Sequence, residues 1–419
     1  SFIAAMQVWL KEKLFLKSNL KKEFKNLQKD IGDELKGKIP ELLFSEHHYS
    51  HASAAFFPSP FNKSLILCMD GVGEWTTTSA WIGENNKIKP LWEISFPHSL
   101  GLLYSSFTYY CGFKVNSGEY KLMGLAPYGN PIYADLIKQE LIEIKKDGTY
   151  RLNMKYFKFH RGFEMTSNRF YKLFGQNPRK AETEITQFHM DIASSIQSVT
   201  EEIVLLLAKS IKKETGLKNL CMAGGVALNC VSNGKILNQK IFDNIWIQPA
   251  SGDAGTSIGA SLYAFYQNSN QKRRIEIVDS MKGSYLGPSF SNQYIESLLK
   301  EIDAKYHKVE DDKLFSLVAK LIAQGNVIGW FNGKMEFGPR ALGSRSILGD
   351  PRSKNMQSIM NQKIKFRESF RPFAPSILEE DVSTQFNFDK KSPYMLFVTT
   401  VKEDLLIKCS SEEKKLRGL

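Results

Sequence analysis

Three of the seven histidines fall within the five residues HHYSH, as His47, His48 and His51. On a helix, His47 and His51 are four residues apart, so both imidazoles project from one face and could share a metal ion. The metalloprotease form of this spacing needs a glutamate base at the second position, where this chain has His48, so the pattern argues against a zinc peptidase. A surface or capping cluster is the other interpretation of these histidines.

A metal ion needs further ligands, and two aspartates stand where strands are expected to end. Asp70 closes the apolar run SLILCMD (64–70), and Asp253 lies in the tight SGDAG turn. Imidazole and carboxylate together suit a divalent first-row metal, iron or zinc more than magnesium. The sequence therefore predicts a metal site made by His47, His51, Asp70 and Asp253.

Two glycine turns are candidates for a nucleotide or phosphate site. In MAGGVALN, Gly224 and Gly225 follow an expected strand and precede a helix, where backbone N–H groups are available to an anion. SGDAG repeats this arrangement one strand later, and neither turn has the Rossmann or P-loop pattern. A single glycine pair could serve helix packing alone. Lys121, in the segment NSGEYKLMGLAPYG, could reach a phosphate or belong to an ordinary glycine-rich loop.

A basic segment lies between residues 334 and 371, with only three acidic residues opposing its cations. Glycine and small residues separate its arginines in FGPRALGSRS, which suits a cradle better than a helix face. Converging arginines bind phosphate oxygens bidentately, so the segment predicts a site for a multiply charged small anion. A solvated basic face or an RNA-binding patch is the alternative. RESFRPFAP is more typical of core phenylalanines alternating with inward-facing arginines than of base-stacking residues. The cations are Lys334, Arg340, Arg345, Arg352, Lys354, Lys363, Lys365, Arg367 and Arg371.

The elements that must position these residues alternate between strands and helices. Two strand-to-helix units are expected at 218–229 and 244–265, after a long helix at 186–214 and a hairpin of 75–83 with 87–96. This order predicts an α/β fold with a mixed or parallel sheet. Helices are expected over 1–38. The polar stretch 268–283 marks a domain boundary, which gives domains at 1–280 and 281–419.

Composition limits the class of protein. Hydrophobic residues make up 42% and charged residues 24%, without a membrane-spanning run or a signal-peptide pattern, so we expect a cytoplasmic globular protein. Five scattered cysteines without C-x-x-C spacing argue against a disulfide framework or a thiolate zinc site. The net charge of +12 suits an anionic partner, either nucleic acid or a phosphorylated small molecule. Both ends of the chain look cut, so a fragment is expected.

Seven motifs in order resemble one known family. They are HHYSHASAAFFPSPF, LCMDGVGEWTTTS, FPHSLGLLYSSFTYYCGFKVNSGEYKLMGLAPYG, MAGGVALN, IQPASGDAG, MEFGPRALGSRSILGDPR and IKFRESFRPFAPSIL. Together they are similar to the NodU/CmcH family of O-carbamoyltransferases, which modify nodulation factors, antibiotics and related sugars. The resemblance covers about residues 40 to 400.

The resemblance implies an actin-like (ASKHA) domain, similar to the tRNA threonylcarbamoyl-adenosine synthase, followed by an incomplete YrdC-like α/β domain. The second domain would convert carbamoyl phosphate and ATP into carbamoyl adenylate, and the first would transfer the carbamoyl group to a substrate hydroxyl. By the same resemblance, the four predicted ligands would bind iron. The expected contacts to nucleotide are Lys121, Gly224, Gly225 and Asn229. Carbamoyl phosphate or its adenylate would be held by Arg340, Lys365 and Arg371.

The sequence departs from the family at both ends, since the first strands of the actin-like domain and the last part of the second domain are missing. The acceptor is expected to be a small molecule or sugar, and a homodimer is allowed for. Asp191 is a weak candidate for the proton acceptor and could equally lie at the surface. Two alternatives stay open: a tRNA threonylcarbamoyl-type transferase, which the DGVGEW block and the second domain disfavour, and a non-enzymatic nucleic-acid-binding protein.

Overall fold

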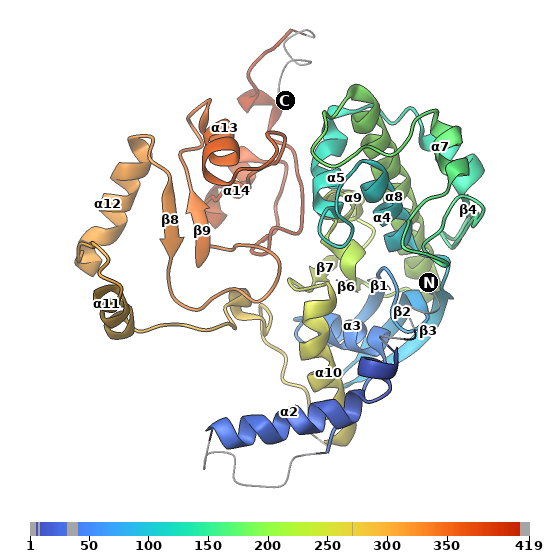
Figure 1. Ribbon diagram of the computed structural model, residues 1–419, viewed down its shortest axis with the longest axis horizontal. Coiled ribbons are helices and arrows are strands. Elements are labelled where there is room, and N and C mark those ends of the chain that lie inside the picture. Colours follow the sequence, from blue (N-terminus) through green and yellow to red (C-terminus); the bar gives the residue numbers. More distant parts are fainter. Residues whose placement is uncertain (1–5, 7–8, 32–40, 270, 411–419) are drawn as a thin grey trace.

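A five-stranded mixed sheet forms the centre of the chain in the computed structural model, which describes residues 6, 9–31, 41–269 and 271–410 (Figure 1). The strand order is β3-β2-β1-β6-β7. The hairpin of β2 (Thr76–Glu84) and β3 (Lys87–Ser95) is antiparallel to β1 (Lys63–Met69). On the other side of β1, β6 (Asn219–Ala223) and β7 (Asn244–Ile247) run parallel to it. The predicted α/β fold with a mixed sheet is confirmed.

The central strand β1 is buried on both faces of the sheet. Its residues 65–69 have no exposed surface, as expected for a continuous apolar run rather than an alternating one. Leu65 pairs with Ile82 of β2 on one side and with Leu220 of β6 on the other. The hairpin turns at Asn85, whose positive φ of 56° suits an asparagine, at the position predicted from the sequence.

Helices cover the sheet and, with the small β4–β5 sheet, complete the first half of the chain, which is the described part up to residue 269. The first-half helix α3 (His47–Phe56) packs against β1, β6 and α10 (Asp253–Asn268). The long helix α8 (Gln187–Thr215) ends at Gly216 in the left-handed conformation, which confirms the predicted helix and its end. The other elements are α4 (Leu100–Tyr110), α5 (Glu119–Leu125), α6 (Ala134–Leu136), β4 (Ile142–Ile144), β5 (Tyr150–Leu152), α7 (Asn168–Phe174) and α9 (Cys230–Asn238).

The N-terminal helix α2 (Leu16–Ile31) follows a π-helical segment, Trp9–Lys13, and projects below α10 (Figure 1). This confirms helix for much of the predicted range 1–38, of which residues 1–5, 7–8 and 32–38 lie outside the described residues. Across the part of the chain that is described, no helix combines the length and apolar character that crossing a membrane would require.

The second half is a smaller α/β unit built on a two-stranded antiparallel sheet. The strand β8 (Ile328–Phe331) pairs with β9 (Arg345–Leu348), with Ile328 opposite Leu348. The basic loop between these strands holds FGPRALGS, so the loop is fixed at both ends by the ladder. The helices are α11 (Asn292–Glu301), α12 (Asp311–Ala323), α13 (Met356–Ser358) and α14 (Val382–Gln385).

The second half does not stand apart from the first. Phe370, Tyr394 and Leu396 are buried in the same hydrophobic cluster as the core of the first half. The polar stretch predicted as a boundary is also packed: the Arg273 guanidinium donates to the carbonyls of residues 56, 57, 59 and 61 at the end of α3. The carboxylate of Asp279 accepts from the Tyr394 hydroxyl at 2.9 Å. The stretch therefore fastens the two halves together.

Candidate metal centre and the turns around it

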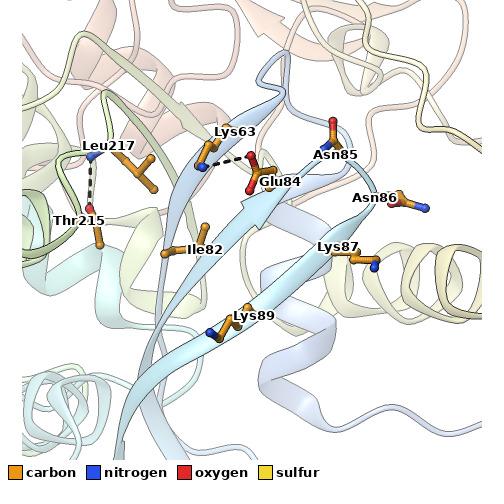
Figure 2. A pocket seen from close by; sticks show the side chains of 9 residues that line it. All are labelled: Lys63, Ile82, Glu84, Asn85, Asn86, Lys87, Lys89, Thr215 and Leu217. Atoms are coloured by element: carbon orange, nitrogen blue, oxygen red, sulfur yellow. Dashed lines mark hydrogen bonds and ion pairs between the residues drawn. The ribbon is translucent and has the colours of Figure 1, made fainter.

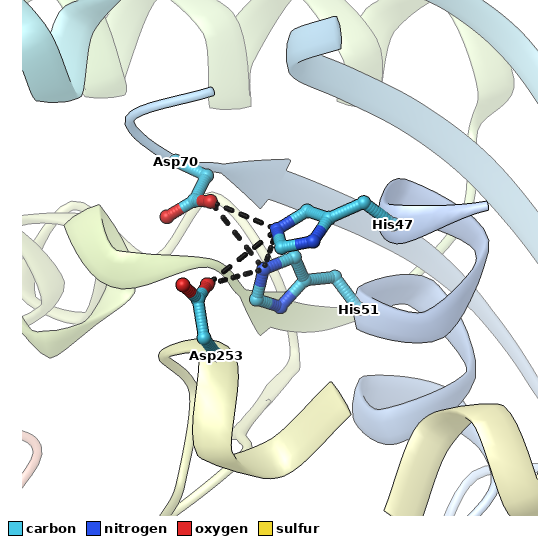
Figure 3. A group of neighbouring side chains, drawn as sticks. All are labelled: His47, His51, Asp70 and Asp253. Carbon is cyan, nitrogen blue, oxygen red and sulfur yellow. Dashed lines mark hydrogen bonds and ion pairs between the residues drawn. The ribbon is translucent and has the colours of Figure 1, made fainter. Parts of the chain in front are cut away.

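Four side chains from three separate elements meet at one point (Figure 3). The Nε2 atoms of His47 and His51, both on the first turns of α3, lie 3.0 Å apart. The Asp70 Oδ2 atom, directly after β1, is 3.1 Å from His47 Nε2 and 3.5 Å from His51 Nε2. The Asp253 Oδ1 atom, from the first residue of α10, is 3.5 and 3.6 Å from the same two nitrogens. The structure thus brings together the four residues that the sequence singled out.

The donor set and its spacing fit a metal ion. Each residue offers one ligand atom, and the four atoms all lie within 4.8 Å of one another. Ligands about 2.0–2.2 Å from a single ion are about 3.0–3.6 Å apart in tetrahedral or octahedral arrangements, which matches these separations. Two imidazole nitrogens at 3.0 Å need either a shared proton or a shared cation between them. Two neutral histidines with two carboxylates suit a divalent first-row metal.

Close packing of α10 on α3 sets the position of Asp253. At Gly259 of α10, an added Cβ would overlap the Ser50 carbonyl of α3, so only glycine permits this approach. Because Gly259 lies less than two turns after Asp253, the same contact brings the first residue of α10 beside the histidines. The predicted tight turn before Asp253 is present, with Gly252 as the N-cap residue.

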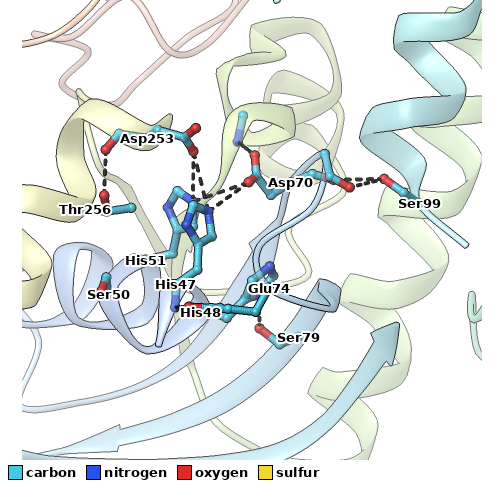
Figure 4. A network of polar contacts seen from close by, with 12 residues as sticks. His47, His48, Ser50, His51, Asp70, Glu74, Ser79, Ser99, Asp253 and Thr256 are labelled. Atoms are coloured by element: carbon cyan, nitrogen blue, oxygen red, sulfur yellow. Dashed lines mark hydrogen bonds and ion pairs between the residues drawn. The ribbon is translucent and has the colours of Figure 1, made fainter. Parts of the chain in front are cut away.

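Asp70 is held by a second set of contacts that orient its carboxylate (Figure 4). Its Oδ1 atom accepts from the backbone N–H of Gly225 at 2.9 Å, which leaves Oδ2 facing the histidines. The Ser99 hydroxyl donates to the backbone carbonyls of Asp70 and Gly71. Burial alone raises the pKa of Asp70, but the bonds to His47, His51 and Gly225 outweigh it and hold the pKa far below its usual range. Asp70 is therefore an anion facing the cluster.

The contacts of two neighbours of the cluster, Glu74 and His48, were not predicted from the sequence. Both carboxylate oxygens of Glu74 accept from the backbone N–H of His47, at 3.0 and 3.2 Å, and so hold the start of α3 (Figure 4). Glu74 follows His47 by 27 residues, so no local spacing could have revealed this contact. His48 faces away, with Nδ1 2.6 Å from the Ser79 hydroxyl. Burial, followed by the charge of His51, lowers the pKa of His48 to about 3.

The predicted nucleotide turn lies directly against the cluster. Gly224 has a φ of 89°, and its N–H donates to the Ser251 carbonyl at 2.7 Å, which ties the two glycine turns to each other. Gly225 is the residue whose N–H holds Asp70. Asn229, predicted with these glycines to contact nucleotide, has other partners. Its side chain caps α9 at the Ser232 N–H and exchanges hydrogen bonds with Gln197 inside the protein.

The predicted cations separate into two places. Arg340 reaches the first half, where its Nη2 atom donates to the Leu228 carbonyl at 2.8 Å, at the end of the glycine turn that was predicted to bind nucleotide. Lys121 instead lies beside the second half, with Nζ 2.6 Å from Glu368 Oε1. Arg371 stands over the ring of Tyr120, next to Lys121. Lys365 lies at the surface, and partial loss of water around its amine, followed by the charges of neighbouring Arg367 and Arg371, lowers its pKa.

Other sequence-based candidates have structural partners. The Asp191 carboxylate accepts from the Asn130 N–H at 2.7 Å and from Gln187, and it does not join the four-residue cluster. Phe370 and Arg371 are buried, as expected for RESFRPFAP, whereas Arg367 of the same motif is only half-buried. Phe373 is half-buried beneath the Arg367 guanidinium.

A pocket of about 510 Å³ lies elsewhere, between the β2–β3 hairpin and the end of α8 (Figure 2). None of the predicted metal, nucleotide or phosphate residues lines it. Its charged lining includes the ion pair of Lys63 with Glu84, 3.1 Å apart, so part of its charge is already neutralised. The residues predicted to do chemistry therefore lie at the cluster and the adjoining turns, away from this pocket.

The fold and the site together define an α/β protein that carries a cluster of two histidines and two aspartates beside glycine turns. Comparison with known proteins identifies its family. Residues 1–262 match the family model described as carbamoyltransferase N-terminus, and residues 319–413 match carbamoyltransferase C-terminus. The chain belongs to this carbamoyltransferase family, the NodU/CmcH family that its motifs resemble.

Two curated relatives are similar over nearly the whole chain. An uncharacterised protein of Synechocystis, sll1178, is 58% identical over 100% of this chain and 68% of its own length. The nodulation protein NolNO of Sinorhizobium fredii is 37% identical over 95% of this chain and 55% of its own length. The chain thus spans only part of these relatives. A solved structure of HypF from T. kodakarensis is 14% identical, with a TM-score of 0.28, over 58% of this chain and 39% of HypF.

Proposed function

We propose that the protein is an ATP-dependent O-carbamoyltransferase. It would use carbamoyl phosphate and ATP to form carbamoyl adenylate and transfer the carbamoyl group to a hydroxyl of a small molecule or sugar. The observation that carries the proposal is the convergence of His47, His51, Asp70 and Asp253 in a chain of the carbamoyltransferase family. Iron is the metal proposed for the cluster.

The fold assignment that accompanies this proposal is an actin-like domain at 1–280 and part of a YrdC-like domain at 281–419. A sheet in which an antiparallel hairpin flanks one side of β1 and two parallel strands flank the other is compatible with the first assignment. The antiparallel β8–β9 pair with its basic loop supports a phosphate-handling role for the second.

The proposed reaction has two steps, activation and transfer, and the atoms balance in each. Carbamoyl phosphate, ATP and water would give carbamoyl adenylate, pyrophosphate and phosphate. In the transfer, the acceptor oxygen forms a bond to the carbamoyl carbon, and the bond from that carbon to the AMP oxygen breaks. AMP leaves with the electron pair, and the acceptor proton passes to a base. A divalent metal bound by the cluster would act as a Lewis acid on the carbamoyl carbonyl.

The protein groups proposed for this reaction are cations and N–H donors that would offset the negative charge of phosphate groups. Lys365 and Arg371 would supply positive charge for carbamoyl phosphate, with Arg371 also 3.5 Å from Glu368, and the Gly225 N–H of the 224–228 turn holds Asp70 of the cluster. Arg340 is the basic residue of the second half that contacts that turn. Lys121 is paired with Glu368, so a phosphate contact from Lys121 would have to compete with this ion pair.

The test is pyrophosphate release from ATP by the whole protein, with and without carbamoyl phosphate. Release that depends on carbamoyl phosphate supports the proposal, and its absence from folded, metal-loaded protein overturns it. His47→Ala should lower metal content and abolish carbamoyl transfer while pyrophosphate release survives. His307→Ala, which changes an exposed histidine, is the matched control and should alter neither property.

A further inference from the structure

Most of the net positive charge of the chain is concentrated in one short region of the first half. Residues 145–180 hold ten lysines and arginines against two acidic residues, which gives them a net charge of +8 out of the +12 of the whole chain. We call them the basic hairpin region. The region contains β5, α7 and, between these, a hairpin that the Phe157–Thr166 bridge closes.

The basic hairpin region has an aromatic core beneath it and exposed cations above. Phe157 of the hairpin and Phe170 of α7 are buried, with ring centroids 6.1 Å apart. Arg151 is exposed between two buried neighbours in β5, and Lys155 and Arg169 are exposed in the hairpin and in α7. The N-cap residue of α7 donates to the Lys155 carbonyl at 3.1 Å. The hairpin and α7 are therefore joined, and their cations cover a shared core.

Few of these cations are neutralised by the protein itself. Among the described residues, only Lys158 of the region has a carboxylate partner, Glu164 at 2.5 Å. Arg151, Lys155 and Arg169 are exposed and form no ion pair within the same part of the chain. Their N–H donors are available to an anion, and an anionic partner would relieve the repulsion between like charges.

A series of aromatic residues connects this region with the metal cluster. Glu74, which accepts from the His47 N–H, is followed by Trp75, whose side chain is 70% exposed. The Trp75 carbonyl accepts from the Phe96 N–H at 2.7 Å, and the Phe96 ring lies 6.3 Å from the ring of Phe159 in the hairpin. Both phenylalanines are half-buried. Three aromatic residues with accessible surface therefore link the start of α3 to the cations.

A second connection runs through the loop that holds Asp70. The Ser99 hydroxyl donates to the Asp70 carbonyl, and the preceding residue, His98, accepts at Nδ1 from the Leu152 N–H at 3.1 Å. Arg151 is the neighbour of Leu152 in β5. Burial, followed by the positive charge of Arg151, lowers the pKa of His98. A few residues in direct contact therefore separate this arginine from the cluster.

The basic hairpin region and the second half lie on opposite sides of the first half. Figure 1 shows α7 and β4 at one edge of the molecule and β8 and β9 at the other. The glycine turn proposed to contact nucleotide is the one that Arg340 of the second half reaches. A molecule bound along the aromatic residues could approach the cluster without crossing that turn. With carboxylates at the cluster and cations at the hairpin, the charges would orient a molecule whose anionic group lies far from its reacting hydroxyl.

We propose that the carbamoyl acceptor is a sugar phosphate ester that reaches from the cluster to the basic hairpin region. The inference rests on the proposed function and names the class of its acceptor. The hydroxyl would lie at the cluster, the sugar against Trp75, Phe96 and Phe159, and the phosphate at Arg151 and Arg169. Aromatic side chains offer a large apolar area to the C–H faces of a sugar ring, and arginine binds phosphate oxygens bidentately. A nucleic acid or an anionic membrane would be attracted by the same cations, but neither requires aromatic residues that begin at the cluster.

The experiment measures binding to the whole protein, with ATP at saturation so that UDP-glucose does not report on a nucleotide site. The two probes are UDP-glucose, in which a sugar is joined to phosphate, and maltotriose, a neutral sugar. UDP-glucose should bind at least about tenfold more tightly than maltotriose, because only UDP-glucose can use the arginines. A higher salt concentration should weaken the binding of UDP-glucose and leave that of maltotriose unchanged.

Three variants with changes at exposed side chains test the two parts of the surface separately. Arg151→Gln should weaken UDP-glucose binding by about fivefold, and Arg151→Gln with Arg169→Gln by more than about tenfold, with maltotriose unaffected. Trp75→Ala should weaken the binding of both probes by about three- to tenfold. Lys313→Gln, which removes an exposed cation of α12 in the second half, is the matched control and should change neither affinity.

Several results would overturn the inference. UDP-glucose that binds no more tightly than maltotriose, or equally well to wild type and to the double arginine variant, would remove the phosphate site. Polyuridylate or phosphatidylglycerol vesicles that bind through Arg151 and Arg169, without binding of UDP-glucose, would assign the region to a nucleic acid or a membrane instead.

These results are distinguishable from failure of the proposed function. Wild-type protein that releases pyrophosphate with carbamoyl phosphate but shows no Arg151-dependent binding of UDP-glucose retains the function and loses the inference. Wild-type protein that binds UDP-glucose as described but never releases pyrophosphate retains the sugar phosphate site and loses the proposed reaction.

Discussion

The metal cluster and the loop at residues 336–345, which we call the arginine loop, are held in place in different ways. The cluster takes its ligands from the first turns of α3 and α10 and from the end of β1, and α3 packs directly on both β1 and α10. The arginine loop joins the two strands of the β8–β9 pair, and between them hydrogen bonds hold its backbone: Glu336 accepts from three of its amides, and the Phe337 N–H donates to the Ser284 carbonyl. The first arrangement holds four ligand atoms at separations that suit a metal ion. The second places the Arg340 guanidinium where the two halves meet.

Because of this difference, we expect substitutions in the two regions to affect metal binding and stability to different extents. Side chains on packed elements cannot move without repacking their neighbours, so loss of one ligand leaves the others in place around an incomplete site. A loop held by a few hydrogen bonds can lose its shape while the rest of the protein stays folded. Ligand changes at the cluster should therefore affect binding most, and changes within packed helices should affect stability most.

The largest effect is expected for Asp70→Asn. The amide has no negative charge to share with a metal, although it can still accept from Gly225 and keep the local shape. We expect metal affinity to fall by more than about 100-fold, beyond what loss of a supporting partner alone costs. The measurement is equilibrium titration with Fe²⁺ or Co²⁺, and Asp350→Asn is the control in the second half. Unchanged affinity in Asp70→Asn would remove the cluster as a metal site.

A medium effect is expected for Gly259→Ala, which tests the packing that places Asp253. The new Cβ would overlap the Ser50 carbonyl, so α10 must move away from α3, at a cost of about 2–3 kcal/mol in the free energy of unfolding. The metal affinity should fall with it, because Asp253 moves too.

The matched change is Gly329→Ala on β8, where an added Cβ meets no atom within 4 Å. We expect a change in the free energy of unfolding of less than about 0.5 kcal/mol there. Urea unfolding of the two variants compares them directly. Equal destabilisation by the two changes would show that the first half is no more tightly packed than the second.

The same contrast explains what could be predicted from the sequence. The spacing of His47 and His51, the strand-end position of Asp70 and the turn at Asp253 are local patterns, and regular elements carry local patterns into space. The partners of Lys121 and Arg340 were not predictable, because each lies more than 100 residues away on the other half. Glu74 was also missed, because its contact with His47 joins a loop to a helix start 27 residues away in the sequence.

The smallest effect concerns the ion pair of Lys121 and Glu368, which joins α5 to the segment 365–371. Burial raises the pKa of Glu368, but the hydrogen bond from Lys121 outweighs burial and lowers it. A carboxyl group with a lowered folded-state pKa contributes its full stability above its unfolded pKa of about 4.3. That contribution is lost as the pH falls through the lowered pKa of the folded state.

Glu368→Gln should therefore weaken the contact between the halves by about 0.5–1 kcal/mol at pH 7 and remove the loss of stability that wild type shows as the pH falls below about 4.3. Hydrogen exchange of the 365–371 amides at several pH values is the measurement, since the ion pair is local to them. Glu296→Gln, which breaks an ion pair with Lys300 inside α11, is the control and should leave the exchange of 365–371 unchanged. If wild type and Glu368→Gln show the same pH dependence at 365–371, the Lys121 ion pair does not hold this segment. The second half would then be anchored by its buried apolar residues, above all Phe370.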